Sequence, residues 1–206
     1  MLEQKLYERN DNDFIRSLIH GRGWAKLVSA VPGSGPVVSH LPVILDPRHA
    51  DATVLGHLAR EDAELHELGR RESVLVFEGP HGYISPSFYK DGPFVPTWNF
   101  VVAHLHGTPE ILDAEQAYET LRATVDHFES QRPEPWSLDT VEHYAQHIAP
   151  GVTAFRLSPT RIVGKAKLSQ DKPDEIVERV IQALGDDGDV HGNLELAYAM
   201  RSASRN

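Results

Sequence analysis

The stretch that decides the fold is WAKLVSAVPGSGPVVSHLPVIL, which occupies residues 24–45. Residues 24–31 and 36–45 are rich in β-branched side chains, which fit a pleated strand better than a helix. Between them, Pro32-Gly33-Ser34-Gly35 supplies the residue types that tight hairpin connections require. The sequence therefore predicts an antiparallel hairpin within a protein built largely on β-strands.

The segments around this hairpin alternate between strands and helices. Asn12 or Asp13 can cap a short helix, and Gly21-Arg22-Gly23 can end it. The run Val74-Leu75-Val76-Phe77 has no polar alternation, which predicts a strand buried on both faces. Periodicity predicts further strands at residues 53–58, 73–78 and 97–108, and helices at residues 61–68, 138–148, 175–184 and 194–202.

The second half of the chain contains a clear helix start. Asp113 and Gln116 have capping-box spacing, and the helix that follows has apolar residues at helical intervals. These predict a buried stripe formed by Ala117, Leu121, Val125 and Phe128. For residues 153–168 the sequence predicts a pair of strands or one bent strand.

Short strands followed by helices are typical of a barrel with helical additions. We expect a mainly β protein with helices, organised as a single domain over residues 1–206. Its helical additions are expected at residues 113–148 and 173–203.

Composition limits the classes of partner. Of 206 residues 40% are apolar, which is ordinary for a globular protein, and no run approaches membrane-spanning length. A net charge of −10 opposes direct DNA binding, because nucleic-acid affinity depends on Lys and Arg neutralising phosphates. The chain has no cysteine and begins without a secretory signal pattern, so we expect a cytoplasmic protein with no membrane association.

Aromatic, hydroxyl, amide and imidazole groups gather in residues 79–89 and 95–100, where packing alone would favour aliphatic residues. This favours a small-molecule pocket. His104-Leu105-His106 places two imidazoles on one side of a strand, but no cysteine or helical His-Glu-x-x-His motif accompanies them. We therefore expect no metal site.

Several motifs resemble the PaiB family of FMN-binding negative transcriptional regulators, which have a split β-barrel. The resemblance rests on GPHGYISPSFY at residues 79–89, VPTWNF at 95–100, HLP at 40–42, GHLAR at 56–60 and GKAKLSQ at 164–170. It implies an FMN cofactor, a homodimer with the cofactor at the dimer interface, and a role in repressing transcription.

A bound FMN requires cations and hydroxyls for its phosphate, a flat or apolar wall for its ring, and polar groups near the ring edge. Arg60 follows a predicted strand and can hold a phosphate with a planar guanidinium. The alternative is a surface Arg that pairs with Glu61 or Glu64. Thr97, Trp98 and Asn99 offer a hydroxyl, an aromatic plane and an amide, but strand alternation sends Thr97 and Asn99 to one face and Trp98 to the other, so only one set can line a given pocket. Trp98 in the core and Asn99 bonded to a neighbouring group is the commoner arrangement.

Two further segments complete the predicted FMN site. His40, Leu41 and Pro42 lie within the second strand of the hairpin, where a proline predicts an edge position or a bulge with backbone groups free for a ligand. A histidine hydrogen-bonded in the barrel wall is the alternative. Lys167 and Ser169 share one face if the segment is a strand, and Gln170 ends it. This row can close over a phosphate or form a solvated strand face.

Alternative functions stay open at this point. A flavin reductase or another FMN-dependent oxidoreductase would use the same cofactor, and some split-barrel proteins bind haem through histidine. The chain also departs from the family pattern, because acids follow Arg60, and Asp171 stands where the PaiB pattern has Asn. Carboxylates beside a phosphate weaken its binding unless they point away.

Overall fold

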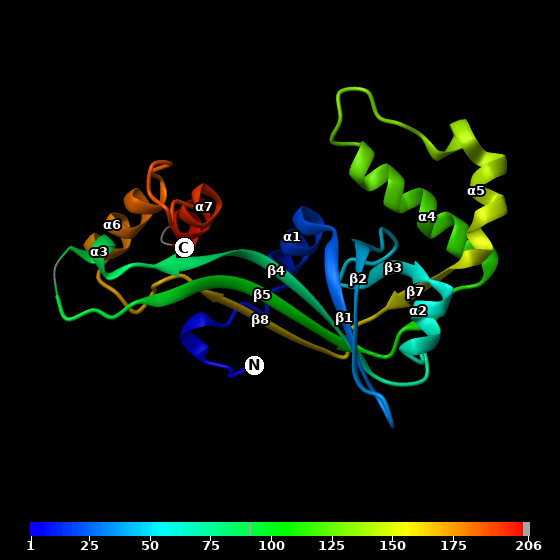
Figure 1. Ribbon diagram of the computed structural model, residues 1–206, viewed down its shortest axis with the longest axis horizontal. Helices are drawn as coiled ribbons and strands as arrows, with labels where there is room; N and C mark the ends of the chain where they lie inside the picture. The colour runs from blue at the N-terminus through cyan, green and yellow to red at the C-terminus, as the bar shows by residue number, and fades with distance from the viewer. Residues whose placement is uncertain (91, 204–206) are drawn as a thin grey trace. The chain divides into compact units, whose positions relative to one another are not determined.

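The computed structural model of the protein describes residues 1–90 and 92–203 (Figure 1), so Asp91 and residues 204–206 of the predicted single domain lie outside the described residues. In the described part, hydrogen bonding joins the strands in the order β6-β7-β3-β2-β1-β4-β5-β8. The strands are β1 (Trp24–Val31), β2 (Gly35–Leu45), β3 (Val54–Ala59), β4 (Ser73–Ile84), β5 (Thr97–Gly107), β6 (Glu110–Ile111), β7 (Val152–Leu157) and β8 (Arg161–Lys167).

Helices occupy the N-terminal segment, the connections between strands and the C-terminal segment. The α-helices are α1 (Asn12–Arg22), α2 (Arg60–Leu65), α3 (Pro86–Tyr89), α4 (Ala114–Glu129), α5 (Glu142–Ile148), α6 (Asp174–Leu184) and α7 (Leu194–Ala203). Short 3-10 helices are η1 (Lys5–Tyr7), η2 (Leu138–Val141) and η3 (Ala149–Gly151). Helices therefore lie within both predicted additions, and the mainly β architecture with helices is confirmed.

The chain forms two compact units. Unit 1 comprises Met1–Asn10, Glu78–Ala103 and Val163–Asn206, and unit 2 comprises Asp11–Phe77 and His104–Ile162. Both units are assembled from segments distant in sequence. The functional geometry below is therefore described within each unit.

Unit 2 is built on the predicted hairpin. β1 and β2 pair antiparallel from Trp24 opposite Pro42 to Val31 opposite Gly35, and β2 then pairs with β3. β3 pairs in turn with β7, with Gly56 opposite Phe155. A Cβ at Gly56 would lie 2.6 Å from the Phe155 ring, so only glycine lets this buried ring cover the strand.

Unit 1 combines the ends of β4, β5 and β8 with the C-terminal helices. Figure 1 shows α6 and α7 side by side. Each helix buries one apolar face, with Val180, Leu184, Leu196 and Met200 each 0% exposed, whereas Leu194 and Tyr198 of α7 are exposed. This amphipathic pattern explains why both helices were predictable from sequence.

Three local predictions are wrong in detail. The cap of α1 is Asp11, whose side chain accepts a hydrogen bond from the Phe14 amide, rather than Asn12 or Asp13. In β4, Leu75 and Phe77 are fully buried, whereas Val74 and Val76 are only half-buried. The strand therefore has one buried face and one partly exposed face, as expected for an antiparallel sheet with one face on the core.

The predicted buried stripe of α4 is also wrong, although the capping box of Asp113 and Gln116 is confirmed. The residues that α4 buries are Thr120 and Thr124. Each threonine hydroxyl donates to the carbonyl one turn earlier, at 2.9 and 2.8 Å, so its burial leaves no hydroxyl unsatisfied. The apolar residues Leu121 and Val125 are half-buried, and Phe128 is exposed.

Candidate functional site

Lys167, at the end of β8, is the centre of a polar cluster in unit 1. Its ammonium donates to the Thr97 hydroxyl and, at 2.8 Å, to the Trp98 carbonyl. Burial lowers the pKa of Lys167, repulsion from Lys165 and Lys172 lowers it further, and attraction to Asp171 opposes this. The cluster thus contains a half-buried cation beside a hydroxyl, and an added anion would stabilise its charged form.

Aromatic rings gather around Trp98, the residue whose carbonyl accepts from Lys167. Trp98 is 55% exposed rather than in the core, because β5 turns Asn99 inward and Trp98 outward. The Trp98 ring lies edge to face with Tyr83 at a centroid distance of 6.2 Å, and Tyr83 contacts His191 at 4.8 Å. The Tyr83, Trp98 and His191 rings form what we call the aromatic shelf of unit 1. Sequence reasoning missed His191, because it lies in an acidic loop far along the chain.

The other predicted polar residues of unit 1 bond within the protein. The Asn99 amide is fully buried and donates to the Ser169 hydroxyl at 2.9 Å and to the Met200 sulfur at 3.4 Å. Gln170 donates to the Ala166 carbonyl at 2.6 Å and accepts from the Leu168 amide at 2.7 Å. These bonds brace the end of β8, and Ser169 takes a positive φ of 69° where the chain leaves the strand. We assign these hydrogen bonds the role of fixing the backbone conformation next to Lys167.

The three predicted residues of β2 point in different directions. His40 is exposed, Leu41 is in the core at 1% exposure, and Pro42 is half-buried. The predicted edge position is wrong, because β2 lies between β1 and β3. Pro42 forms the last pair with β1, and pairing with β3 starts at Val43. A proline is tolerated there because the strand changes partners at that residue.

Arg60 begins α2 and lies at a cavity of about 570 Å³ in unit 2. Its Nε donates to the Pro150 carbonyl at 2.8 Å, and its Nη2 donates to the same oxygen, so this carbonyl takes the place of the predicted Glu61 or Glu64 partner. The cavity also receives Tyr118, whose buried hydroxyl has no partner among the described residues. Asp113 and Glu115 add negative charge to the lining. The described lining residues of this cavity thus include one cation, Arg60, and two carboxylates.

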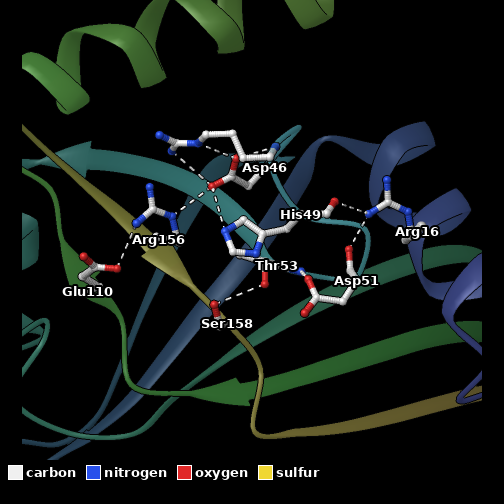
Figure 2. Close-up of polar contacts among 9 residues, drawn as sticks. Arg16, Asp46, His49, Asp51, Thr53, Glu110, Arg156 and Ser158 are labelled. Carbon is white, nitrogen blue, oxygen red and sulfur yellow. Dashed lines mark hydrogen bonds and ion pairs between the residues drawn. The ribbon is translucent and has the colours of Figure 1, made fainter.

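A separate charged network in unit 2 surrounds Asp46 (Figure 2). The fully buried Asp46 carboxylate accepts from the Arg156 Nε at 2.9 Å and from the Arg48 Nε and backbone amide at 3.1 and 3.0 Å. His49 lies 3.9 Å from the same carboxylate, and Arg156 also donates to Glu110 at 3.0 Å. Burial alone would raise the pKa of Asp46, but the Arg48 and Arg156 bonds outweigh it and hold the pKa at about 2.

The Asp46 network was absent from the sequence predictions. Asp46-Pro47-Arg48 carries the signal of a turn in which an Asp accepts from a backbone amide two residues on, but its Arg156 partner lies 110 residues away. The network ties the end of β2 to β7. Its side-chain oxygens and guanidinium groups bond to one another, so we assign it a structural role.

The remaining histidines do not gather into a metal site. Across residues 1–90 and 92–203, no group of three or more His, Asp or Glu side chains is placed to hold a metal ion. His66 is fully buried and bonds to the Ser29 and Ser39 hydroxyls at 2.8 and 3.0 Å. In the same described part, no helix combines the length and apolar character needed to cross a membrane.

The predicted FMN residues thus fall into two groups. Unit 1 brings Thr97 and Trp98 together with Lys167, supported by the Asn99 and Ser169 contact. The others belong to unit 2, where His40, Leu41 and Pro42 lie on β2 and Arg60 lies at the start of α2.

Comparisons with known proteins agree with this architecture. Protease synthase and sporulation protein PAI 2 of Bacillus subtilis is 26% identical over 182 residues, which cover 87% of each chain. The flavocytochrome Anf3 from Azotobacter vinelandii has a TM-score of 0.61 at 16% identity, covering 86% of this chain and 78% of that one. The FAD and heme binding protein from Mycobacterium smegmatis has a TM-score of 0.58 at 15% identity, covering 84% and 79%.

At these low identities the two solved structures establish the fold, which is the split β-barrel predicted from the sequence. The sequence comparison goes further. Residues 1–161 match the family model described as "Putative FMN-binding domain". Because this match spans most of the chain, the protein belongs to that family, and the resemblance to PaiB is confirmed.

Proposed function

We propose that the protein binds FMN through unit 1, with the phosphate at Lys167 and Thr97 and the ring against the aromatic shelf. One observation carries the proposal: Lys167 bonds to the Thr97 hydroxyl and to the backbone carbonyl of Trp98, whose ring is exposed, although these residues are about 70 positions apart in sequence. A cation, a hydroxyl and an aromatic surface are the groups that an FMN phosphate and ring require. The family match over residues 1–161 supports FMN binding by the chain.

The donors of the Lys167 cluster fit a phosphate. Within the described residues, Lys167 donates hydrogen bonds through two of its three N–H groups, so one remains to donate to a phosphate oxygen. The Thr97 hydroxyl accepts from Lys167 and keeps its own proton to donate. The hydrogen bond between Asn99 and Ser169 fixes the backbone of both segments next to Lys167. Bound FMN would supply redox chemistry, while these residues bind and orient it.

The test is an FMN titration that follows flavin fluorescence and absorption, with riboflavin as the ligand that lacks the phosphate. Lys167→Met should weaken FMN binding about 10-fold or more, because a charge-assisted hydrogen bond contributes about 1.5–3 kcal/mol. Riboflavin binding should change little. Lys5→Met, an equal charge change at an exposed position of unit 1, should leave FMN affinity unchanged.

The two remaining variants locate the ring and test the other predicted anchor. Trp98→Leu should weaken FMN and riboflavin equally, because it removes the ring contact and leaves the phosphate contact. If Arg60→Met weakens FMN binding and Lys167→Met does not, the phosphate binds at Arg60 and the unit 1 site is wrong. A protein that ignores FMN but binds haem, with a strong Soret absorption band, would overturn the flavin proposal in favour of a haem-binding split barrel.

We also propose a homodimer in which a second copy covers one face of β1, β2 and β4. The pairing register puts Val28 opposite Val38 on one side and Val74 on the other, with Trp24 on the same face. Trp24 and Val38 are 54% and 52% exposed, with Lys26 and His40 paired between them on the same face, and exposed large apolar side chains of this kind are typical of an interface. Sedimentation should give twice the chain mass for the wild type and a monomer for Val38→Glu, with Val190→Glu as control. A monomeric wild type would contradict the dimer.

The biological role that we propose is PaiB-type negative control of transcription, in the cytoplasm, exerted through a protein partner rather than an operator. The net charge of −10 supports this indirect route. Mobility-shift assays should show no DNA binding at physiological salt, whereas a specific operator complex would contradict the indirect route. Rapid reduction of bound FMN by NADH or NADPH would instead favour an FMN-dependent oxidoreductase.

A further inference from the structure

A second cavity of unit 2, of about 460 Å³, lies among β3, α4, η2 and α5. Its walls are largely apolar, and three of its large side chains are well exposed: Phe128 at 41%, Trp136 at 44% and Ile148 at 50%. Leu121 and Val125 of α4 complete the apolar side. The apolar face of α4, which the sequence predicted to be buried in the core, therefore lines a cavity. Its volume lies in the range of small-molecule sites.

His57 on β3 supplies the main polar group of this cavity. Its Nδ1 is buried and has no hydrogen-bond partner among the described residues. Burial lowers the pKa of His57, and no charged neighbour opposes the effect, so the imidazole is neutral at neutral pH. A neutral imidazole offers one donor and one acceptor, and a buried polar atom without a partner is costly. His57 therefore brings to the cavity lining an imidazole whose Nδ1 has no partner among the described residues.

The charges around the cavity restrict what can bind. Among the described residues that line it there is neither Lys nor Arg, in contrast to the cavity at Arg60. The one carboxylate among these lining residues, Glu129, accepts from the Trp136 amide at 3.0 Å and pairs with the Arg132 Nε at 3.4 Å. An anionic ligand would therefore find no cation among the described residues of the wall. The lining therefore favours a neutral molecule.

We propose that this cavity is a binding site for a neutral, largely apolar small molecule that forms one hydrogen bond with His57. The cavity lies in unit 2, and its lining includes none of the unit 1 residues proposed to bind FMN, although it does include Pro42, which the sequence predicted for FMN. A second, apolar ligand would give the protein a sensory input in addition to the flavin. A bound ligand would contact both α4 and α5, because both helices contribute to the cavity walls.

The test uses N-phenyl-1-naphthylamine, a neutral apolar dye with one N–H group that fluoresces strongly when bound. The full-length wild type should bind the dye saturably. Val125→Trp, which fills the cavity, should weaken binding at least about 10-fold, and Val190→Trp, the same change at a residue 90% exposed in unit 1, should leave it unchanged. His57→Phe should weaken binding several-fold. Ile148→Trp fills the cavity from α5 instead of α4, and it replaces Val125→Trp in this test if that variant does not fold.

Selectivity for neutral ligands is measured with 8-anilinonaphthalene-1-sulfonate, an anionic dye of similar size, which should bind at least about 10-fold more weakly than the neutral dye. Equal binding of the two dyes would overturn the proposal, as would dye binding that neither filling variant changes. If both filling variants convert a dimer into a monomer and the wild type does not bind the neutral dye, the face is a contact with a second copy and the proposal fails. FMN titration of the same variants shows whether the unit 1 site remains intact.

Discussion

Two clusters of charged side chains, one in each unit, differ in how completely their hydrogen bonds are satisfied. In unit 2, the Asp46 carboxylate is 0% exposed and is surrounded by Arg48 and Arg156, which donate to both of its oxygens. In unit 1, Lys167 is half-buried and bonds to the uncharged Thr97 hydroxyl and to the backbone carbonyl of Trp98, whose ring is exposed. Among the described residues, Asp46 has opposite charges in direct contact, whereas Lys167 does not.

This difference separates a structural network from a ligand site. A buried charge that is fully paired stabilises the fold through its partners, and breaking the pair is costly. A half-buried cation without a directly bonded carboxylate retains the capacity to bind an anion. The two clusters should therefore respond in opposite ways to substitution: Asp46 through stability, and Lys167 through ligand affinity.

The largest effect is expected from Asp46→Asn. The substitution keeps the side-chain shape but leaves Arg48 and Arg156 without their shared carboxylate, so the free energy of unfolding should fall by about 3 kcal/mol. Urea denaturation of the protein, followed by Trp fluorescence and circular dichroism, measures this loss. The control is Glu110→Gln, which removes the exposed partner of Arg156 and should cost less than about 0.5 kcal/mol. Equal losses in both variants would show that the buried pair has no special role.

Acid should weaken the same network. The pKa of Asp46 is about 2 in the folded protein and about 3.9 for an unperturbed Asp, so its stabilisation is complete above about pH 4. It is lost as the pH falls toward 2, and the lost contribution is about 2 kcal/mol. The difference in unfolding free energy between the wild type and Asp46→Asn should therefore shrink over this range. A difference that stays constant from pH 5 to pH 2.5 would contradict the lowered pKa.

The Lys167 cluster should instead make FMN affinity sensitive to alkaline pH. Because burial lowers the pKa of Lys167 in the free protein, its ammonium should lose its proton at a lower pH than an ordinary lysine. FMN affinity should then fall about 10-fold as the pH rises through that pKa, since the deprotonated amine no longer attracts phosphate. Riboflavin has the same titrating ring as FMN but no phosphate, so the pH dependence of its affinity measures the effect of the ring alone. In Lys167→Arg, FMN affinity should lose the additional pH dependence that riboflavin does not show. If that additional pH dependence persists in Lys167→Arg, Lys167 is not its source.

The sequence predicted those features that depend on nearby residues. The hairpin around Pro32–Gly35 and the capping box of Asp113 were predictable because the decisive groups lie within a few residues of one another. The Asp46 and Arg156 pair was not, because its members are 110 residues apart. The burial of Thr120 was missed because a hydroxyl that bonds to the preceding turn can be buried, although hydrophobicity assigns it to the surface.

The candidate site was predicted in part for the same reason. The chemical groups of Thr97, Trp98 and Lys167 could be identified in the motifs, but the sequence could not show that Lys167 donates to the other two. Asn99 and Ser169 have equally polar side chains, yet they bond to each other inside unit 1. Residue type indicated which groups were available, and only tertiary packing separated those directed outward from those directed inward.

The smallest predicted effect concerns Asp171, at the position where the PaiB pattern has Asn. The Asp171 carboxylate pairs with Lys172 at 2.6 Å, and its charge raises the pKa of Lys167. The same negative charge must repel a phosphate bound at Lys167, so Asp171→Asn should strengthen FMN binding about 3-fold at low salt. Riboflavin affinity should not change, and the gain should shrink at 0.5 M NaCl. Asp187→Asn, an equal charge change at an exposed loop position of unit 1, controls for net charge. If both variants strengthen FMN binding equally, the effect comes from net charge; if Asp171→Asn weakens it, the phosphate does not bind beside Lys167.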